Sequence, residues 1–401
     1  MIKKGQLSLF SLQAGGNIGH GDVYLTNLCY WLAKQKPIQV YTFPSVELAE
    51  AISKFDNILY ESPDRGTVKS VKKSDYNKYS FFKLPIYGFA RARSYYKMIS
   101  GFYKKFPDSE NYHLLDFEYF STVLYLMLRP KLLKRTYLGF HSSDFEWISG
   151  RSITVNLYKW ILKIPLHLLV KKSGGATTHG HFLKQRLEVN LRLRNNKVHV
   201  IPYGSDFINL DNHDRELHRE KYGVPPSKVL LLFGVLREDK GIKEVLQHFS
   251  SVSDKAHLLI AGADGDVTGA EVQKWVDYND LSSRITLVNR YFTDSEMEEI
   301  FSFADFVVIP YKKYHIAFSG PLSLAVQYSR PVIASDIGEI GAFVKKYNIG
   351  HLFECEDWVS FVDETNIALE NLNTFSYSFE RCQQENSWEA MSRQFIRIYN
   401  D

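Results

Sequence analysis

Cysteine is scarce in this sequence. Only three occur in 401 residues, at Cys29, Cys355 and Cys382, and their wide spacing matches neither a zinc site nor a disulfide framework. Long apolar runs are also missing, since the most apolar stretch, residues 155–170, is interrupted by two lysines, a proline and a histidine. The apolar run near the start ends at Leu12 and is too short for a signal peptide. We therefore expect a protein of a reducing compartment without a membrane-spanning helix.

A strong net charge is absent as well, but the average hides an asymmetry. The formal charge of the whole chain is only +4. Residues 1–205 hold 30 lysines and arginines against 14 acids, a balance of +16, whereas residues 206–401 hold 19 against 31, a balance of −12. The hydrophobic fraction of 45% excludes wholesale disorder, so two folded halves of opposite charge should meet different partners.

Both halves alternate short apolar runs with helical patterns, which predicts an α/β architecture with parallel sheets. The predicted strands are residues 7–12, 38–43, 112–115, 136–140, 176–178 and 198–201 in the first half, and 229–233, 257–261, 285–288, 306–309 and 331–334 in the second. Turn-forming residues at 201–206 mark the boundary between them. We expect two Rossmann-like domains facing each other across a cleft, at 1–204 and 205–384, followed by a C-terminal helix at 385–401.

The segment Ser319-Gly320-Pro321 predicts the start of a helix. Serine is a good N-cap, and proline suits the first turn because its missing N–H costs nothing there. The free backbone N–H groups at such a helix end can bind a phosphate. By itself the pattern fits an ordinary capped helix equally well.

A second segment, Phe233-Gly234-Val235-Leu236-Arg237-Glu238-Asp239-Lys240-Gly241, follows a predicted strand and opens a helix. Arg237 and Lys240 stand three residues apart at the carboxyl end of that strand, which in open α/β sheets faces the ligand. Two cations at this place suit a diphosphate, although they could also be solvated surface charges.

Together these segments resemble the nucleotide-sugar-dependent glycosyltransferases of family 4, often called group 1. The resemblance rests on Phe-Gly-x-x-Arg-x-x-Lys-Gly, on Ser-Gly-x-Leu-x-Leu-Ala followed by Arg-Pro-Val-Ile-Ala-Ser-Asp, on Ile201-Pro202-Tyr203-Gly204-Ser205-Asp206, and on Ser387-Trp388-Glu389 before the last helix. It covers nearly all of the second half and the first half only in outline. It implies the GT-B fold with a C-terminal helix that crosses back to the first domain, a donor nucleotide held by the second domain, and retention of anomeric configuration.

The resemblance also implies roles for individual residues. Arg237 and Lys240 would stabilise the departing nucleoside diphosphate, and His141, in a position matching a family histidine near the donor sugar, would be catalytic with them. The expected donor-binding residues are Gly16, Gly19, Arg237, Lys240, His315, Phe318, Ser319 and Gly320. Gly16 and Gly19 belong to a glycine-rich loop, Gly15–Gly21, that lacks the dinucleotide spacing Gly-x-Gly-x-x-Gly.

Two features bear on how far the resemblance reaches. The two glutamates common in the family are replaced here by Ile316 and Leu324. This replacement resembles a sub-branch of the family, and it leaves the identity of the donor sugar undetermined. Asp264-Gly265-Asp266 matches the metal motif of a different glycosyltransferase fold, but turn chemistry explains it without a metal. We expect no metal and no cofactor besides the donor substrate.

A basic and aromatic strip occupies residues 69–106, which hold ten lysines and arginines, one acid and eleven aromatic residues. Such a strip suits an anionic membrane surface, with nucleic acid as the less favoured partner and the protein core as another place for the aromatics. The candidate membrane-binding residues are Lys72, Lys73, Lys83, Arg91, Arg93, Lys97, Lys104 and Lys105.

The leading hypothesis is a metal-independent, retaining hexosyltransferase that moves a sugar from a UDP- or GDP-sugar to a lipid-linked or glycan acceptor in bacterial-type polysaccharide or glycolipid synthesis. It would be cytoplasmic, peripheral on the inner face of the cytoplasmic membrane, and would not bind nucleic acid. The alternatives are a sugar-nucleotide epimerase or glycan phosphorylase of the same fold, or a non-catalytic membrane-bound adaptor with a degenerate donor site.

Overall fold

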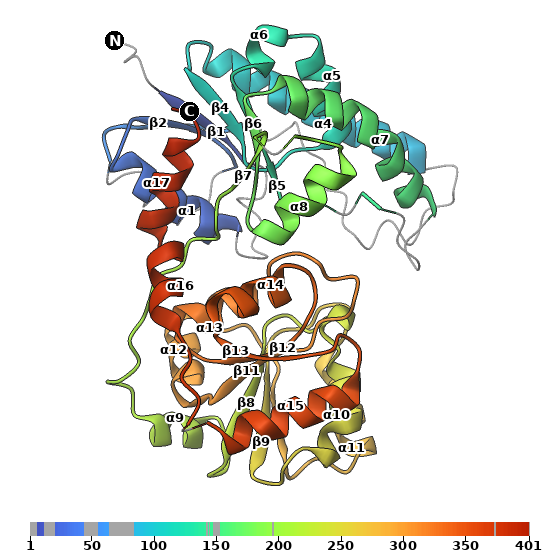
Figure 1. Ribbon diagram of the computed structural model, residues 1–401, viewed down its shortest axis with the longest axis vertical. Helices are drawn as coiled ribbons and strands as arrows, with labels where there is room; N and C mark the ends of the chain where they lie inside the picture. The colour runs from blue at the N-terminus through green and yellow to red at the C-terminus, as the bar shows by residue number, and fades with distance from the viewer. Residues whose placement is uncertain are drawn as a thin grey trace. The chain divides into compact units, whose positions relative to one another are not determined.

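The computed structural model divides the chain into two compact units (Figure 1). Unit 1 comprises Met1–His179, Lys184–Gly204 and Trp388–Asp401, and unit 2 comprises Gly180–Leu183 and Ser205–Ser387. The structure describes residues 6–11, 21–43, 55–63, 84–141, 143, 145–146, 153–194, 196–372 and 374–400. The Gly16–Gly19 loop and the basic residues Lys72, Lys73 and Lys83 lie outside this part of the chain.

Unit 1 is built on a parallel seven-stranded sheet in the order β3-β2-β1-β4-β5-β6-β7. The strands are β1 (Leu7–Phe10), β2 (Ile38–Tyr41), β3 (Ile58–Glu61), β4 (Asn111–Leu114), β5 (Thr136–Phe140), β6 (Gly175–Thr178) and β7 (Val198–Val200). All but β3 were predicted. The residues of β3 are half-exposed at the sheet edge, so its apolar signal is weak.

Six helices accompany this sheet among the described residues. They are α1 (Gly21–Ala33), α4 (Leu84–Lys105), α5 (Tyr119–Met127), α6 (Pro130–Leu133), α7 (Ile153–Lys172) and α8 (His181–Asn190). No helix of the described chain is long and apolar enough to cross a membrane.

The C-terminal helix α17 (Trp388–Arg397) belongs to unit 1, where it packs on α1 (Figure 1). Its apolar face joins the core beneath β1 and β2 through Trp388, Met391 and Phe395. The Phe395 ring stacks on the buried His113 ring of β4 at 4.7 Å between centroids. The last helix therefore completes the core of the first unit.

Unit 2 has a parallel six-stranded sheet in the order β10-β9-β8-β11-β12-β13. The strands are β8 (Lys228–Phe233), β9 (Ala256–Ala261), β10 (Ile285–Val288), β11 (Phe306–Ile309), β12 (Val332–Ser335) and β13 (Gly350–Phe353). Strands β8, β9, β11 and β12 are almost wholly buried, as expected of a sheet with helices on both faces.

The helices of unit 2 cover both faces of this sheet. They are α9 (Arg215–Lys221), α10 (Ile242–His248), α11 (Gly269–Tyr278), α12 (Asp294–Phe303), α13 (Gly320–Gln327), α14 (Gly338–Tyr347), α15 (Trp358–Glu370) and α16 (Phe379–Asn386), with 3-10 turns η2 (Glu238–Lys240) and η3 (Phe249–Ser251). In each sheet the strand order reverses once, between β1 and β4 in unit 1 and between β8 and β11 in unit 2. Ligands of doubly wound folds bind at such reversals.

The packing of α17 predicts a large loss of stability for Phe395→Ala. This side chain is 1% exposed and fills the core around His113, so its removal should cost about 3–5 kcal/mol. Urea denaturation of the full-length protein measures the effect. Arg393→Ala on the same helix is the control, because its exposed side chain should contribute less than about 0.5 kcal/mol. Equal stability of the two variants would contradict the packing of α17.

Candidate functional site

The predicted phosphate-binding residues of unit 2 lie where its strand order reverses. Residues 234–241 follow β8, residues 310–319 follow β11, and these two strands are neighbours in the sheet. Parallel strands bring both loops to the same edge. Segments that are about 80 residues apart in the sequence therefore form one cluster.

Arg237 is held by a two-pronged ion pair with Asp239. Its Nε donates to Oδ1 at 2.9 Å and its Nη2 donates to Oδ2 at 2.7 Å. The Nδ1 atom of His315 lies 3.1 Å from the same Oδ2. Burial alone would raise the pKa of Asp239, but His315 and Arg237 together hold that pKa below its usual value. The carboxylate thus fixes both basic side chains in one place.

Lys240 is a buried cation in the same cluster. Its side chain is almost fully enclosed, and Nζ donates to the Phe233 backbone oxygen at 2.6 Å. Burial, assisted by the nearby Arg237 charge, lowers the pKa of Lys240 to about 7, against a smaller opposing effect of Asp239. A bound anion would strongly stabilise the charged form of an ammonium group in such surroundings.

Gly234 makes room for that ammonium group. Its φ of +95° is a conformation that side chains rarely adopt, and a Cβ built there would lie 2.9 Å from Lys240 Nζ. The same Cβ would lie 3.7 Å from Cγ of Pro321, in the first turn of α13. The cation and the N-terminus of α13 are therefore neighbours.

The start of α13 has the predicted capping geometry. Ser319 is buried at the N-cap, and its Oγ accepts from Leu322 N at 3.4 Å. The same hydroxyl donates to Tyr311 Oη at 3.4 Å. Gly320 opens the helix, and Phe318 packs on the unit 2 core with its ring edge toward Phe343 at 5.1 Å. A capped helix end beside two cations is a suitable site for phosphate oxygens.

His315 closes the cluster on the side of Tyr311. The two rings stack with centroids 4.0 Å apart, and Nδ1 faces Asp239. The other nitrogen, Nε2, is buried and makes no hydrogen bond with any described residue. A buried imidazole nitrogen without a partner is ready to contact a bound ligand.

The positions of the missing family glutamates are apolar and buried. Ile316 and Leu324 are each 7% exposed. The backbone oxygen of Ile316 accepts from Glu339 N at 3.1 Å, where Gly338 lets the chain turn with a φ of +53°. Apolar packing therefore occupies both positions.

The Asp264-Gly265-Asp266 segment forms a turn, as predicted. Asp264 Oδ1 accepts from Gly269 N at 2.7 Å, and Asp266 Oδ1 accepts from Glu238 N at 3.0 Å. Both carboxylates thus fix the backbone around the loop that carries Arg237. Among the described residues, no group of three or more histidines, cysteines or acids could hold a metal ion.

In unit 1, His141 follows β5 and pairs with His179, which follows β6. His141 Nδ1 lies 2.9 Å from His179 Nε2, His141 Nε2 lies 2.9 Å from Leu115 O, and His179 Nδ1 lies 3.2 Å from Ile201 O. Each of these three hydrogen bonds needs one ring N–H as its donor, whereas two neutral imidazole rings carry only two N–H groups. Burial lowers the pKa of both rings, with Asp116 opposing the shift at His141. Both nitrogens of His141 are thus engaged within unit 1.

The basic strip is partly described. Residues 84–105 form helix α4, which was not predicted, and Arg93, Lys97 and Lys104 are exposed on it. Lys105 forms an ion pair of 3.2 Å with Glu61, and the side chain of Arg91 is outside the described part.

The aromatic part of the strip is mainly core at its C-terminal end. Phe102, Tyr103 and Phe106 are buried, so for these three residues the alternative that the aromatics fill the protein core is confirmed. Their spacing of three, four and seven residues from Ile99 is the helical signal that identifies this buried face.

Two residues of the unit 2 cluster were missed by sequence reasoning. Asp239 orients Arg237 and His315, and Tyr311 stacks on His315 and contacts Ser319. Asp239 stands between the two predicted cations, so its position was a signal. No sequence signal identified Tyr311, because it joins the unit 2 cluster only through the pairing of β8 with β11.

Comparison with known proteins identifies a family match within unit 2. Residues 227–371 match the family model "Glycosyl transferases group 1", which spans the cluster in unit 2. No curated protein matches the chain.

Several solved structures share the fold over the whole chain. A glycosyltransferase from Rickettsia africae ESF-5 is 15% identical, with a TM-score of 0.70 and coverage of 100% of this chain and 98% of that one. Anabaena Alr3699/HepE, solved in complex with UDP, is 12% identical, with a TM-score of 0.72 and 99% of each chain covered. The lipopolysaccharide outer core galactosyltransferase WaaB is 13% identical, with a TM-score of 0.67 and 98% of each chain covered. Unit 2 thus contains a region that matches the group 1 glycosyl transferases, and the whole chain shares the GT-B fold of these solved structures.

Proposed function

We propose that the protein transfers a sugar from a nucleoside-diphosphate sugar and that the unit 2 cluster binds the donor diphosphate. The observation that carries this proposal is the buried Lys240 ammonium group beside the N-terminus of α13. A phosphate oxygen there would receive positive charge from Lys240 and Arg237 and N–H groups from the helix. UDP in the HepE complex supports uridine diphosphate as the carrier, and guanosine diphosphate is the alternative.

The proposed reaction is a front-side displacement with retention of configuration. The bond between the anomeric carbon and the donor phosphate oxygen breaks, and its electron pair leaves with the nucleoside diphosphate. The acceptor hydroxyl oxygen bonds to the same face of that carbon, and its proton passes to the leaving phosphate oxygen. Arg237 and Lys240 stabilise the negative charge that develops on this oxygen.

We propose that this chemistry requires no metal ion. Two cationic side chains and a helix N-terminus converge on one place and together can balance the charge of a diphosphate. His315 Nε2 is available for a further contact with the donor. His141 would act near the sugar after exchanging one of its two contacts within unit 1.

The proposed acceptor is a lipid-linked sugar or glycan at the inner face of the cytoplasmic membrane. Helix α4 supports this because it contains five basic residues and no acid. A lipopolysaccharide-modifying enzyme among the structural neighbours, WaaB, is consistent with such an acceptor. The burial of Ile316 and Leu324 favours a non-catalytic adaptor as the second candidate.

Nucleotide binding is the direct test of the donor site. UDP or GDP at saturating concentration should raise the unfolding temperature by at least about 2 °C, because binding to the folded state alone adds stability. The matching nucleoside monophosphate should have a smaller effect, since it lacks the second phosphate. If none of these nucleotides stabilises the protein, the donor site is degenerate and the adaptor is favoured.

Arg237→Ala and Lys240→Ala should each lower turnover at least about 100-fold, because each removes charge that stabilises the leaving diphosphate. Radiolabelled sugar transfer measures turnover, and thermal melting checks that the fold is kept. Lys243→Ala is the control, since Lys243 is an exposed cation in the following helix and should be dispensable. Near-normal turnover in either site variant contradicts the assignment.

Lys240 should take up a proton when a nucleoside diphosphate binds. With a pKa of about 7, most of the free protein carries a neutral amine at pH 8, and the bound diphosphate favours the charged form. Calorimetry of UDP binding at pH 8 in buffers of different ionisation enthalpy should report uptake of about one proton. Lys240→Met should abolish the uptake, and an unchanged value in that variant would rule out Lys240 as its source.

The same pKa predicts a pH dependence of stability. The ordinary lysine value is 10.5, so between pH 7 and 10.5 the unfolded chain binds more protons at this position than the folded chain. The destabilising contribution of Lys240 is therefore complete below pH 7 and fades as the pH rises to 10.5. Urea denaturation of wild type and Lys240→Met across this range should show the difference shrink with rising pH. A constant difference would mean that the lysine is not perturbed.

A further inference from the structure

Helix α7 exposes an apolar face. Its buried side, which includes Leu162, Leu166 and Leu169, packs on the core of unit 1. Its other side exposes seven large apolar or aromatic side chains at helical spacing, namely Ile153, Leu157, Tyr158, Trp160, Ile161, Ile164 and Leu168. Trp160 is 62% exposed and Ile164 is 73% exposed. A helix that is apolar on both sides needs a second apolar environment.

Helix α5 extends this face. It contacts α7, and Tyr158 Oη donates to Glu118 Oε1 at 2.7 Å across the two helices (Figure 1). Phe120, Leu124 and Leu128 are exposed four residues apart at and beyond α5. Ten of the nineteen exposed large hydrophobic residues of the described chain thus belong to α5, its C-cap and α7. We call this surface the α5–α7 face.

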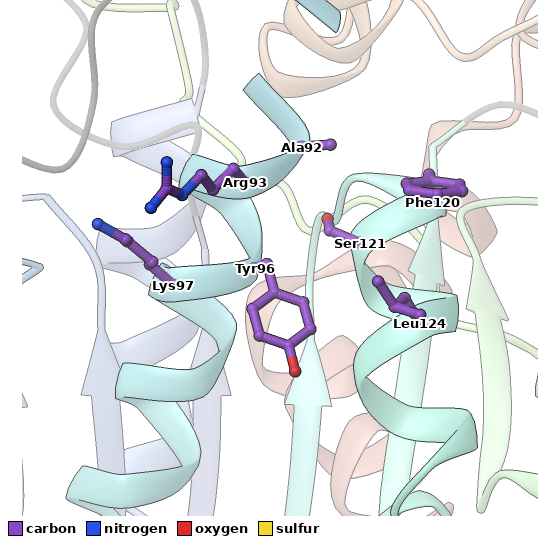
Figure 2. A pocket seen from close by; sticks show the side chains of 7 residues that line it. All are labelled: Ala92, Arg93, Tyr96, Lys97, Phe120, Ser121 and Leu124. Carbon is purple, nitrogen blue, oxygen red and sulfur yellow. The ribbon is translucent and has the colours of Figure 1, made fainter. Parts of the chain in front are cut away.

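An apolar groove borders the face. A cavity of about 370 Å³ lies between α4 and α5, lined by Ala92, Arg93, Tyr96, Lys97, Phe120, Ser121 and Leu124. In the view of Figure 2, the charged ends of Arg93 and Lys97 extend from α4 on the side away from α5. The groove therefore combines an apolar interior with basic side chains at its edge.

Apart from Glu118, the charged residues of the helices around the face are basic. Helices α4, α5 and α7 and the segment 128–135 contain no acidic residue, whereas α7 has four lysines and 128–135 has four basic residues. Lys131, Lys134, Lys171 and Lys172 are exposed. The nearest carboxylate, Glu118, accepts from Phe120 N and Ser121 N at the start of α5. A surface of this composition complements anionic lipid headgroups above an apolar layer.

We propose that the α5–α7 face inserts into the interfacial layer of an anionic lipid bilayer. Trp160, Ile161 and Ile164 enter the acyl boundary, and the surrounding lysines bind the headgroups. This inference rests on the proposed membrane location and replaces the aromatic strip as its anchor, since Phe102, Tyr103 and Phe106 are core. Insertion through α7 needs no spanning segment, because only one face of the helix is immersed.

The test is sedimentation of the full-length protein with liposomes of phosphatidylglycerol and phosphatidylethanolamine. Trp160→Ser with Ile164→Ser should weaken binding at least about tenfold, because two apolar side chains no longer enter the bilayer. The matched control is Tyr278→Ser with Val359→Ser, which removes one aromatic and one β-branched side chain, both exposed, from unit 2. It should bind like wild type, and raising the salt concentration should weaken binding of both proteins.

Three results would overturn the proposal. The first is unchanged liposome binding by the Trp160/Ile164 variant, and the second is no binding of wild type to anionic liposomes. The third is a wild-type dimer in lipid-free solution that this variant converts to a monomer, which would make the face a contact between two copies. Thermal shift with UDP separates these results from failure of the donor site, because the unit 2 cluster is intact in the variant.

Discussion

The buried ammonium group of Lys240 is the constraint on which the unit 2 site depends. A cation enclosed by protein loses hydration, and a single backbone oxygen, that of Phe233, replaces only part of it. The loop must also leave space for the group, which Gly234 does with its positive φ and missing Cβ. The incompletely solvated ammonium group therefore favours the binding of an anion at the start of α13. In the proposed function a diphosphate supplies that negative charge, and the ion pair of Arg237 with Asp239 fixes the position of the second cation.

Both units use the same edge of a parallel sheet for their polar groups. In unit 2 the loops after β8 and β11 carry the cations and the helix start. In unit 1 the ends of β5 and β6 carry His141 and His179, whose shared contact leaves one proton too few for three hydrogen bonds. The backbone N–H and C=O groups of these strands form hydrogen bonds within the sheet. The loops at the carboxyl ends of the strands can therefore carry the polar and charged side chains of a site.

The charge asymmetry of the chain acquires a physical basis in helices α4, α5 and α7. These elements lack acidic residues and surround the exposed apolar face, whereas the acids of unit 2 serve as caps and ion-pair partners, as Glu271 does at the start of α11 and Asp239 does for Arg237. Each unit therefore presents a different chemistry: cations concentrated at one buried site in unit 2, and cations spread around an apolar surface in unit 1.

The sequence by itself determined the α/β class, eleven of the thirteen described strands and the capped start of α13, because alternating apolar runs and N-cap residues act locally. It also placed Arg237 and Lys240 in one loop. Only the tertiary structure decided that Lys240 is buried, that Tyr311 lies in the same cluster, that Phe102 is core and that Trp160 is exposed. Burial depends on which surfaces the neighbouring strands and helices cover, and the same helical spacing of apolar residues describes a face on the core and a face on solvent.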